Sequence, residues 1–455
     1  MHLRLLKLWE ELRGSYWFVP GLMVVGGILL SLGTVSLDGY FQLEVLRRLG
    51  FLWSGGAEGA RGLLQTVAGS MITVAGVTFS ITMVALSFAS SQFGSRLLRN
   101  FMTDTGNQLV LGTFVATFIY CLMVLRTVRS DGDAEFVPYI SVTMGLVLAL
   151  VSLFVLIYFF HHMALTMQAP YIVGEAADDL LKAIERLFPS DTGAGPPQEQ
   201  ESGTEPSIPS DFEEHSVPIY SDVNGYVQAI DETDLVGIAS RHDLVVKLSH
   251  RPGHFQVKGD ILAYVWPGDR LDHDLEQKLK ATVITGRQRT YTQDVEFGIE
   301  QLVEVAERSL SASLNATFTA IACIDWLGAA LAKLSKKNFP SPYRYDHEGN
   351  LRILFERPLT LEGVIDTAFN QIRQSARDNV AVRIRLLEQI GILQTITDNP
   401  RALHALQRHA RMVEDDTDHH SLQSEDREEI NQLYRRSTTE NRNVRKGESE
   451  KRKKG

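Results

Sequence analysis

Hydroxyl side chains recur every three or four residues along a segment that carries no charge. The segment runs from Gly62 to Ser95, which exceeds the roughly 20 apolar residues that cross a hydrocarbon core. Spacings of three and four place side chains on one face of a helix. The positions on that face are Thr66, Ser70, Thr73, Val77, Ser80, Val84, Ser87 and Ser91. We therefore expect a membrane-spanning helix with one polar face.

A polar face inside a membrane span turns away from lipid and meets either other helices or water. The first alternative is tight packing of small residues between neighbouring helices. The second is a polar pathway, whose lining residues would be Thr66, Ser70, Thr73, Ser80, Ser87 and Ser91. Three polar residues follow the face and either reach lipid phosphates or form the mouth of such a pathway. They are Gln92, Arg96 and Arg99.

Apolar segments predict four transmembrane helices. They cover about residues 17–35, 66–93, 108–125 and 137–160, with Tyr and Trp residues near several ends as interfacial anchors. No segment after residue 165 is apolar enough to span again. We therefore expect a transmembrane domain over 1–165, followed by a soluble region.

Charges and cysteines favour a cytoplasmic C-terminal region. Arginines in the short loops are equally numerous on the two sides, so they do not decide the orientation. Lys182 and Arg186 follow the last span and weakly favour the cytoplasmic side. The two cysteines, Cys121 and Cys323, lie in helical stretches and indicate no disulfide framework. The prediction is a multi-pass protein of the bacterial inner membrane with both termini in the cytoplasm.

The net negative charge belongs to the soluble region. Residues 1–170 contain ten Lys plus Arg and nine Asp plus Glu, which leaves 35 of the 45 basic and 46 of the 55 acidic residues for the remainder. An acidic domain repels nucleic acid, so no nucleic-acid partner is expected. The stretch 437–455 ends in a basic cluster and is expected to be a disordered charged tail, with contact to anionic lipid as the alternative.

The soluble region divides by composition and periodicity. A membrane-exit helix is expected over 166–188, and a flexible linker rich in Pro, Gly, Ser, Glu and Gln over 189–211. Period-two alternation predicts a small β module over 212–268. Helical periodicity dominates 269–436, interrupted by a hairpin near residue 350. The predicted fold is an α-helical integral membrane protein with an α+β soluble C-terminal region, in which the β module precedes a mainly helical domain.

The β module resembles a known small fold. The run GYVQAI at 225–230 and the run PGHFQVKGDILAYV at 252–265 resemble the two half-motifs of barrel-sandwich domains of the biotinyl and lipoyl type. Those carrier domains expose a modifiable lysine on a tight hairpin, whereas Lys247 falls within an alternating strand. A structural spacer or docking module is therefore expected rather than carrier chemistry.

Motifs of common enzymes are missing from the sequence. It contains no G-x-x-x-x-G-K-[ST], G-x-G-x-x-G, G-x-S-x-G, H-E-x-x-H or C-x-x-C. His161 and His162, and the acidic and histidine cluster over 414–420, could bind a metal. Anchoring at the membrane interface explains the two histidines better, and a solvated segment between helices explains the cluster better. No enzymatic reaction, cofactor or metal is therefore predicted. Asp325 follows an apolar helix face and needs a partner such as Arg289 or Arg308.

Three long runs resemble a bacterial family of predicted membrane proteins, domain of unknown function 2254. They extend from Thr78 to Phe101, from Leu111 to Val128 and from Arg289 to Leu327. The resemblance covers the chain from the first span to about residue 400. It implies the location and the architecture, and it brings no reaction, ligand or catalytic residue.

This chain departs from the family pattern in one turn. Relatives tend to have Ser-Pro, Asn-Asp-Pro and Thr-Ala where this sequence has Ser311-Ala312, Asn315-Ala316-Thr317 and Thr319-Ala320. If the turn binds a ligand through its carboxylate in relatives, this protein has lost part of that site, and without the prolines the segment continues more easily as helix. The candidate site of the soluble region is Arg289, Asp294, Asn315, Thr319 and Asp325.

Two hypotheses about function follow. Four helices bury too little polar surface to enclose a wide pathway, so a conducting protein would have to be a homo-oligomer around the second helix. The leading hypothesis is an oligomeric channel- or transporter-like protein for an unknown small ion, with a cytoplasmic regulatory domain. The alternative is a membrane-anchored sensor or scaffold whose soluble domain binds a ligand or partner.

Overall fold

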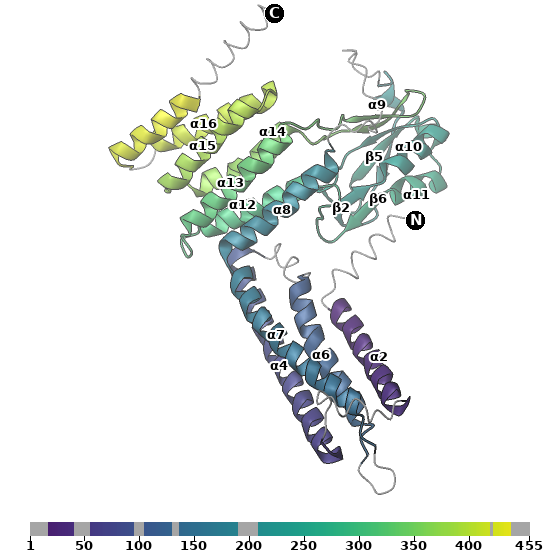
Figure 1. Ribbon diagram of the computed structural model, residues 1–455. Helices are drawn as coiled ribbons and strands as arrows, with labels where there is room; N and C mark the ends of the chain where they lie inside the picture. Colours follow the sequence, from purple (N-terminus) through teal and green to yellow (C-terminus); the bar gives the residue numbers. More distant parts are fainter. Residues whose placement is uncertain are drawn as a thin grey trace, which may run out of the picture. The chain divides into compact units, whose positions relative to one another are not determined.

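The computed structural model describes residues 17–40, 55–94, 104–129, 136–189, 208–418 and 422–437 (Figure 1). The chain divides into two compact units, Met1–Ile172 and Val173–Gly455. The first unit is helical and the second combines helices and sheets. Most of the predicted linker and all but the first residue of the predicted tail lie outside the described residues.

The first unit is built around one central helix. Its helices are α2 (Phe18–Tyr40), α4 (Ala57–Phe93), α6 (Thr105–Leu125) and α7 (Tyr139–Thr166), and α6 packs against the other three. Large side chains fill the space between α4, α6 and α7, including the fully buried Phe114, Tyr120 and Phe159. The helix α4 begins at Ala57, nine residues before the predicted start of the second span. Its first turns contain the charged residues Glu58 and Arg61, which the prediction from apolar residues left out.

A carboxylate from α2 caps the beginning of α7. Asp38 accepts hydrogen bonds from the backbone N–H groups of Ile140 (2.8 Å) and Ser141 (2.9 Å), and from the Ser141 hydroxyl (2.7 Å). The Tyr120 hydroxyl of α6 lies 2.9 Å from the Thr34 hydroxyl and donates to the Ser141 carbonyl oxygen. Free N–H groups at a helix start are costly in an apolar medium, so this network joins α2, α6 and α7 at one end of the unit.

A second polar pair joins α6 and α7 near their other ends. Asp104 caps α6 by accepting from the Gly106 N–H (2.8 Å), and its second oxygen lies 2.6 Å from His162 Nε2. The ring of Tyr158 stacks on His162 at 5.4 Å. His162 is therefore engaged inside the unit in an ion-pair geometry, which the sequence did not predict.

Among the described residues, five helices are long and apolar enough to cross a membrane: α2, α4, α6, α7 and α13 (Thr317–Leu334). The fifth belongs to the second unit, where Cys323, Ile324 and Leu327 are fully buried and the helix packs against three other helices. The predicted count of four spans is thus not fixed by length and composition alone.

Two sheets form the β part of the second unit. The first has the strand order β1 (Val217–Tyr220), β5 (Ile261–Trp266), β3 (Val245–Leu248), β8 (Leu351–Phe355) and β7 (Tyr343–Tyr345), and the second has β4 (Phe255–Gln256), β2 (Gly225–Ile230) and β6 (Val283–Gly286). All pairs are antiparallel except β3 with β8. The predicted hairpin is confirmed as β7–β8, and it joins a sheet that starts more than a hundred residues earlier.

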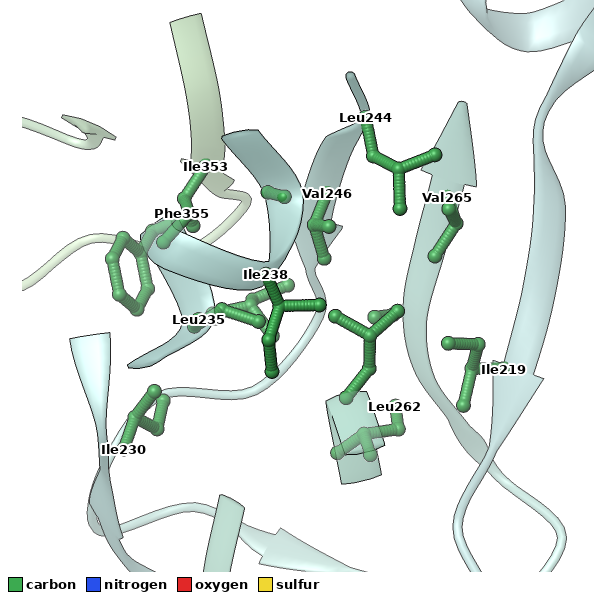
Figure 2. Close-up of a cluster of buried hydrophobic side chains, with 14 of the residues drawn as sticks. Ile219, Ile230, Leu235, Ile238, Leu244, Val246, Leu262, Val265, Ile353 and Phe355 are labelled. Atoms are coloured by element: carbon green, nitrogen blue, oxygen red, sulfur yellow. The ribbon is translucent and has the colours of Figure 1, made fainter. Parts of the chain in front are cut away.

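Apolar side chains from both sheets meet over two short helices, α10 (Glu232–Arg241) and α11 (His273–Ala281). Figure 2 shows side chains of α10, such as Leu235 and Ile238, beside Val246 of β3 and Ile353 of β8. The buried positions alternate along β2 from Gly225 to Ala229, as the period-two pattern predicted, whereas β5 buries the consecutive residues Leu262 and Ala263. Because β8 contributes to this core, the core includes residues outside the 212–268 stretch.

The remainder of the second unit is helical. It contains α8 (Ala169–Leu187), whose residues from Val173 belong to this unit, followed by α12 (Val295–Ser309), α13, α14 (Leu361–Ser375), α15 (Val380–Ile396), α16 (Pro400–Asp418) and a helix over 424–437. Side chains cap four of these helices at their starts: Asp294 for α12, Thr360 for α14, Asn379 for α15 and Asn399 for α16. Helices α12 and α13 form a hairpin, and α14 and α15 pack on α12 and α13 respectively.

A buried arginine fastens the β7–β8 turn to the start of β3. Arg352 is 7% exposed, and it donates to Asp346 (2.7 Å) and to Asp243 (2.8 Å). Asp346 also accepts from the N–H groups of Glu348 and Asn350. Burial would raise the pKa of Asp346, but the hydrogen bonds from Arg352 and Asn350 lower it to about 2. The charge of Asp346 therefore stabilises the fold above its ordinary pKa, and this contribution is lost as the pH falls toward 2.

We predict that Asp38→Ala destabilises the first unit by about 2 kcal/mol, because three donors lose a charged acceptor. Unfolding in mixed detergent micelles measures this loss. Ser36→Ala is the matched control, since the exposed Ser36 hydroxyl bonds only to the Leu32 carbonyl of its own helix. An equal effect of both substitutions would contradict the capping role.

We also predict that Arg352→Met lowers the free energy of opening of β3 and β8 by about 3 kcal/mol, because Asp346 is left buried without its cation. Native-state hydrogen exchange of these strands measures the change. Arg270→Met should cost less than about 1 kcal/mol, since Arg270 binds the same Asp243 from the exposed side. Comparable losses in the two variants would show that burial of the pair does not matter.

Candidate functional site

The helix α4 exposes its entire predicted polar face. All six hydroxyl residues of the face are exposed, namely Thr66, Ser70, Thr73, Ser80, Ser87 and Ser91. Val77 and Val84, which complete the face, are 55% and 67% exposed. Within the part of the chain that the structure describes, no helix covers this face.

The opposite face of α4 packs against the rest of the first unit. It is formed by small residues with one large side chain in each half, Leu64 and Phe93. The other buried positions are Ala57, Ala60, Ala68, Ala75, Thr78, Thr82, Ala85 and Ala89. The recurrence of alanine at helical spacing marks this second face in the sequence, but the face was not among the predictions. Because α4 has one packed and one open face, the hydroxyl residues do not hold the subunit together.

The exposed hydroxyls differ in their hydrogen bonding. Thr66 and Thr73 donate to the carbonyl oxygens of Gly62 (2.7 Å) and Gly69 (2.8 Å) in their own helix. Ser91 likewise donates to Phe88. The hydroxyls of Ser70, Ser80 and Ser87 make no hydrogen bond among the described residues. In a membrane these three hydroxyls are open to water, to a neighbouring chain or to a carbonyl oxygen of their own helix.

Glycines run beside the hydroxyls at intervals of seven residues. Gly62, Gly69 and Gly76 each precede a hydroxyl residue by four positions, namely Thr66, Thr73 and Ser80. A Cβ atom on any of these glycines would meet nothing within 4 Å. The glycine motif was readable in the sequence but was not predicted as part of the site. A seven-residue repeat of small residues is typical of close, left-handed packing between two membrane helices.

Glycines elsewhere in the first unit show what such packing looks like once it is formed. A Cβ on Gly27 would lie 2.9 Å from the Ala116 carbonyl oxygen, and one on Gly112 would lie 3.2 Å from the Pro20 Cα. These glycines let α2 and α6 approach closely. The glycines of α4 likewise lack a side chain, but among the described residues no neighbouring helix lies within 4 Å of the position that a Cβ would take.

The predicted mouth of the pathway is only partly described. Gln92 is half-buried in the last turn of α4. Arg96 and Arg99 lie outside the described residues.

In the second unit, two of the five predicted site residues come together. Arg289 donates to both oxygens of Asp294 (2.7 and 3.0 Å) and to Glu300 (2.6 Å). Asp294 is 2% exposed and also accepts from the Phe297 N–H at the start of α12. Burial would lower the pKa of Arg289, but its two carboxylate partners raise it. The satisfied pair fixes the segment before α12, and its oxygens are already occupied.

A second charged group lies close to this pair. Arg251 binds Glu296 at 2.5 Å, and the ring of His250 contacts His254 edge-on at 6.2 Å. Burial lowers the pKa of His254 to about 4, and the positive charges of Arg251 and Arg289 act in the same direction. His254 is therefore neutral at physiological pH. No local pattern in the sequence predicts this, because the burial and the arginines that lower its pKa come from the fold.

The other three predicted residues lie elsewhere. Asn315 has φ of +44° in the exposed turn before α13, and Thr319 is half-buried in the first turn of that helix. Since α12 has 15 residues and a helix rises 1.5 Å per residue, about 22 Å separates its two ends. Asp294 and Asn315 flank opposite ends of α12, so the five residues do not form one site.

Asp325 pairs with a residue that the sequence analysis did not name. It accepts from Arg385 (2.5 Å) and from Gln389 (3.1 Å), which ties α13 to α15. Arg289 and Arg308, the partners suggested from sequence, instead bind Asp294 and Glu304. The suggested pairing was wrong because helix contacts, and not distance along the chain, select the partner.

No group of three or more metal-binding side chains occurs among the described residues. His419 and His420 of the acidic cluster lie outside them. An open cleft at the end of α13 is lined by Lys333, Lys336 and Lys337 together with Glu185, which binds Lys333.

Comparison with known proteins gives the family. An uncharacterised protein of Mycobacterium bovis is 32% identical over 416 residues, which are 89% of this chain and 76% of that protein. Uncharacterised proteins of two Mycobacterium tuberculosis strains match with the same identity and coverage. No solved structure matches. The model of the family described as predicted membrane protein, domain of unknown function 2254, matches residues 13–391. With apolar helices that fit this description, the chain belongs to that family of predicted membrane proteins.

Proposed function

We propose that the protein is a multi-pass inner-membrane protein that assembles as a homo-oligomer around α4, with the hydroxyl face lining a channel-like pathway. The single observation that carries this proposal is the complete exposure of that face on a helix whose other face is packed. Helices α2, α4, α6 and α7 are the four spans of the proposal. The second unit is then a cytoplasmic regulatory domain.

The interior of one subunit supports a pathway between subunits rather than within one. Phe114, Tyr120 and Phe159 are fully buried and occupy the space among α4, α6 and α7. Polar groups that could replace the hydration shell of an ion are instead on the outside, at Ser70, Ser80 and Ser87. Copies related by rotational symmetry would bring these outside faces to a shared axis.

The length of α4 fits this arrangement. Its 37 residues extend about 55 Å, compared with roughly 30 Å of hydrocarbon. Hydroxyl positions from Thr66 to Ser91 span 25 residues, or about 38 Å. The face therefore crosses the full apolar thickness and continues beyond it.

The helix α13 is not counted as a span in this proposal. Its buried side holds Cys323, Ile324 and Leu327, and Asp325 on the same helix is paired with Arg385 of α15. An apolar helix with these partners is the central helix of a soluble core.

A second candidate function is a membrane-anchored sensor or scaffold. Two observations favour it: Thr66 and Thr73 already bond to their own helix, and the glycine repeat suits close packing that leaves no space for an ion. The lysine-lined cleft of the second unit would then take an anionic ligand. In this function the β module that resembles barrel-sandwich domains serves for docking and not as a carrier domain. Lys247 is paired with Glu356 at 3.2 Å, whereas a carrier domain would expose its lysine for modification.

Leucine substitutions on the hydroxyl face distinguish the two candidates. In a pathway, Ser80→Leu or Ser87→Leu places a bulky apolar group where ions pass, so flux through reconstituted protein should fall at least tenfold while the oligomer persists. In a closely packed interface the same substitutions should dissociate the oligomer first. Phe79→Leu is the control, because Phe79 is exposed on α4 beside the hydroxyl face. Unchanged flux and unchanged assembly in both serine variants would refute the central role of α4.

Cysteine cross-linking tests self-association directly. Thr73→Cys should form disulfide-linked dimers in native membranes, since a symmetric interface brings the same position of two copies together. Cys121 and Cys323 are fully buried, so the unsubstituted protein supplies the background. The control Ile72→Cys, on the exposed flank of α4, should cross-link much less. Equal cross-linking at the two positions would indicate random collision.

The orientation has its own test. A reporter enzyme that is active only in the periplasm should be inactive when fused after residue 440. Its activity there would place the second unit outside the cytoplasm. The regulatory role assigned to that unit would then have to be given up, whereas the α4 interface would be unaffected.

A further inference from the structure

We propose that the turn between α12 and α13 is a membrane-contact element, in which Leu314 and Phe318 enter the surface of the bilayer. This inference goes beyond the oligomeric pathway, because it concerns the second unit and does not require the α4 interface. Phe318 is 86% exposed and Leu314 is 37% exposed. Among the described residues of the second unit, Phe318 is the most exposed large apolar side chain.

The turn carries no charge. From Ser309 to Ile324 there is no Asp, Glu, Lys or Arg, although the chain after residue 170 has 46 acidic and 35 basic residues. Ala312, Ser313, Leu314 and Asn315 are all exposed within this charge-free stretch. A charged group is costly at the boundary between headgroups and acyl chains, whereas aromatic and aliphatic side chains are favourable there.

Part of the backbone of the turn is hydrogen-bonded internally, which lowers the cost of bringing that part out of water. The N–H of Asn315 donates to Ser311 (2.9 Å), and the N–H of Ala316 donates to Ser309 (2.7 Å). The Ser311 hydroxyl donates to the Arg308 carbonyl oxygen (2.6 Å). The start of α13 has no side-chain cap, so the first N–H groups of that helix find partners among headgroups or water, and Leu314 and Phe318 enter only the boundary between headgroups and acyl chains.

Packing of α8 places the turn at the end of the unit where the chain enters. Leu180 lies against Gly298, near the start of α12, and further along α8 Arg186 donates to the Tyr291 carbonyl oxygen before that helix. Helix α8 therefore runs antiparallel to α12, and its earlier residues are directed toward the end of α12 and the turn. The unit begins at Val173, seven residues after the last apolar helix of the first unit ends at Thr166. A tether of this length keeps the turn at high effective concentration near a membrane surface.

The size of the apolar patch favours lipid over a second protein molecule. A stable interface buries about 800 Å² on each partner, and two side chains supply only part of that area. A tethered contact with lipid needs no such area, because the spans already hold the protein in the membrane.

Fluorescence quenching in nanodiscs tests the proposal with the full-length protein. Phe318→Cys or Leu314→Cys is labelled with an environment-sensitive dye, in discs of phosphatidylethanolamine and phosphatidylglycerol at a ratio of three to one. The matched control is Glu348→Cys, since Glu348 is an exposed residue of the charged β7–β8 turn in the same unit. The buried Cys121 and Cys323 give the labelling background.

We expect nitroxide-labelled lipid to quench the dye at 318 and 314, and iodide in the buffer to quench it at least threefold less than at 348. Equal iodide quenching at all three positions would overturn the proposal. Protection that disappears when labelled protein is diluted with unlabelled protein in the same membrane would also overturn it, because the partner would then be a second copy. Phe318→Glu should restore access of iodide to the dye at 314, whereas a persistent block would mean that lipid does not cover the turn.

Discussion

The hydrogen bonds that the Asp38 carboxylate accepts at the start of α7 are the interaction on which the first unit depends. The carboxylate satisfies the first N–H groups of α7, which would otherwise face an apolar medium without a partner. Tyr120 adds the central helix to the same network through Thr34 and Ser141. Since α6 packs against α2, α4 and α7, this one hydrogen-bond network sets the positions of α2, α6 and α7 relative to one another. The apolar contacts between them then fix only the finer packing.

With its other helices tied in this way, the unit leaves the hydroxyl face of α4 available for something outside the subunit. The buried alanine face of α4 has already provided the intramolecular contacts, so the exposed hydroxyls and glycines are not needed for folding. Polar groups on an exposed face of a membrane helix, where the subunit's own packing does not use them, point to a contact outside the subunit. The second unit behaves differently, because buried charges such as Arg289 and Asp294 are paired with each other inside the unit.

Periodicity along the chain predicted the helices of the first unit and the strands around Gly225 and Asp260, because burial on one face of an element leaves a local signature. The family was also recognisable from the sequence, and the comparison confirms it. Partners distant in sequence were not predictable. Asp325 pairs with Arg385 of α15, and Arg352 pairs with Asp243, which lies more than a hundred residues away in the sequence. Such pairs depend on which helices and strands become neighbours, and a single sequence does not encode that in any local pattern.

The parallel pairing of β3 with β8 constrains how the protein is made. Val246 pairs with Ile353, so a ribosome must release α12, α13 and the β7 strand before the first sheet can close. Until then β3 has one open edge, and apolar residues such as Val246 lack the side chain of Ile353 that covers them. Open edges of this kind pair readily with other chains. The nascent chain is therefore most vulnerable to aggregation during the synthesis of roughly a hundred residues, at a time when its apolar helices have already reached the membrane.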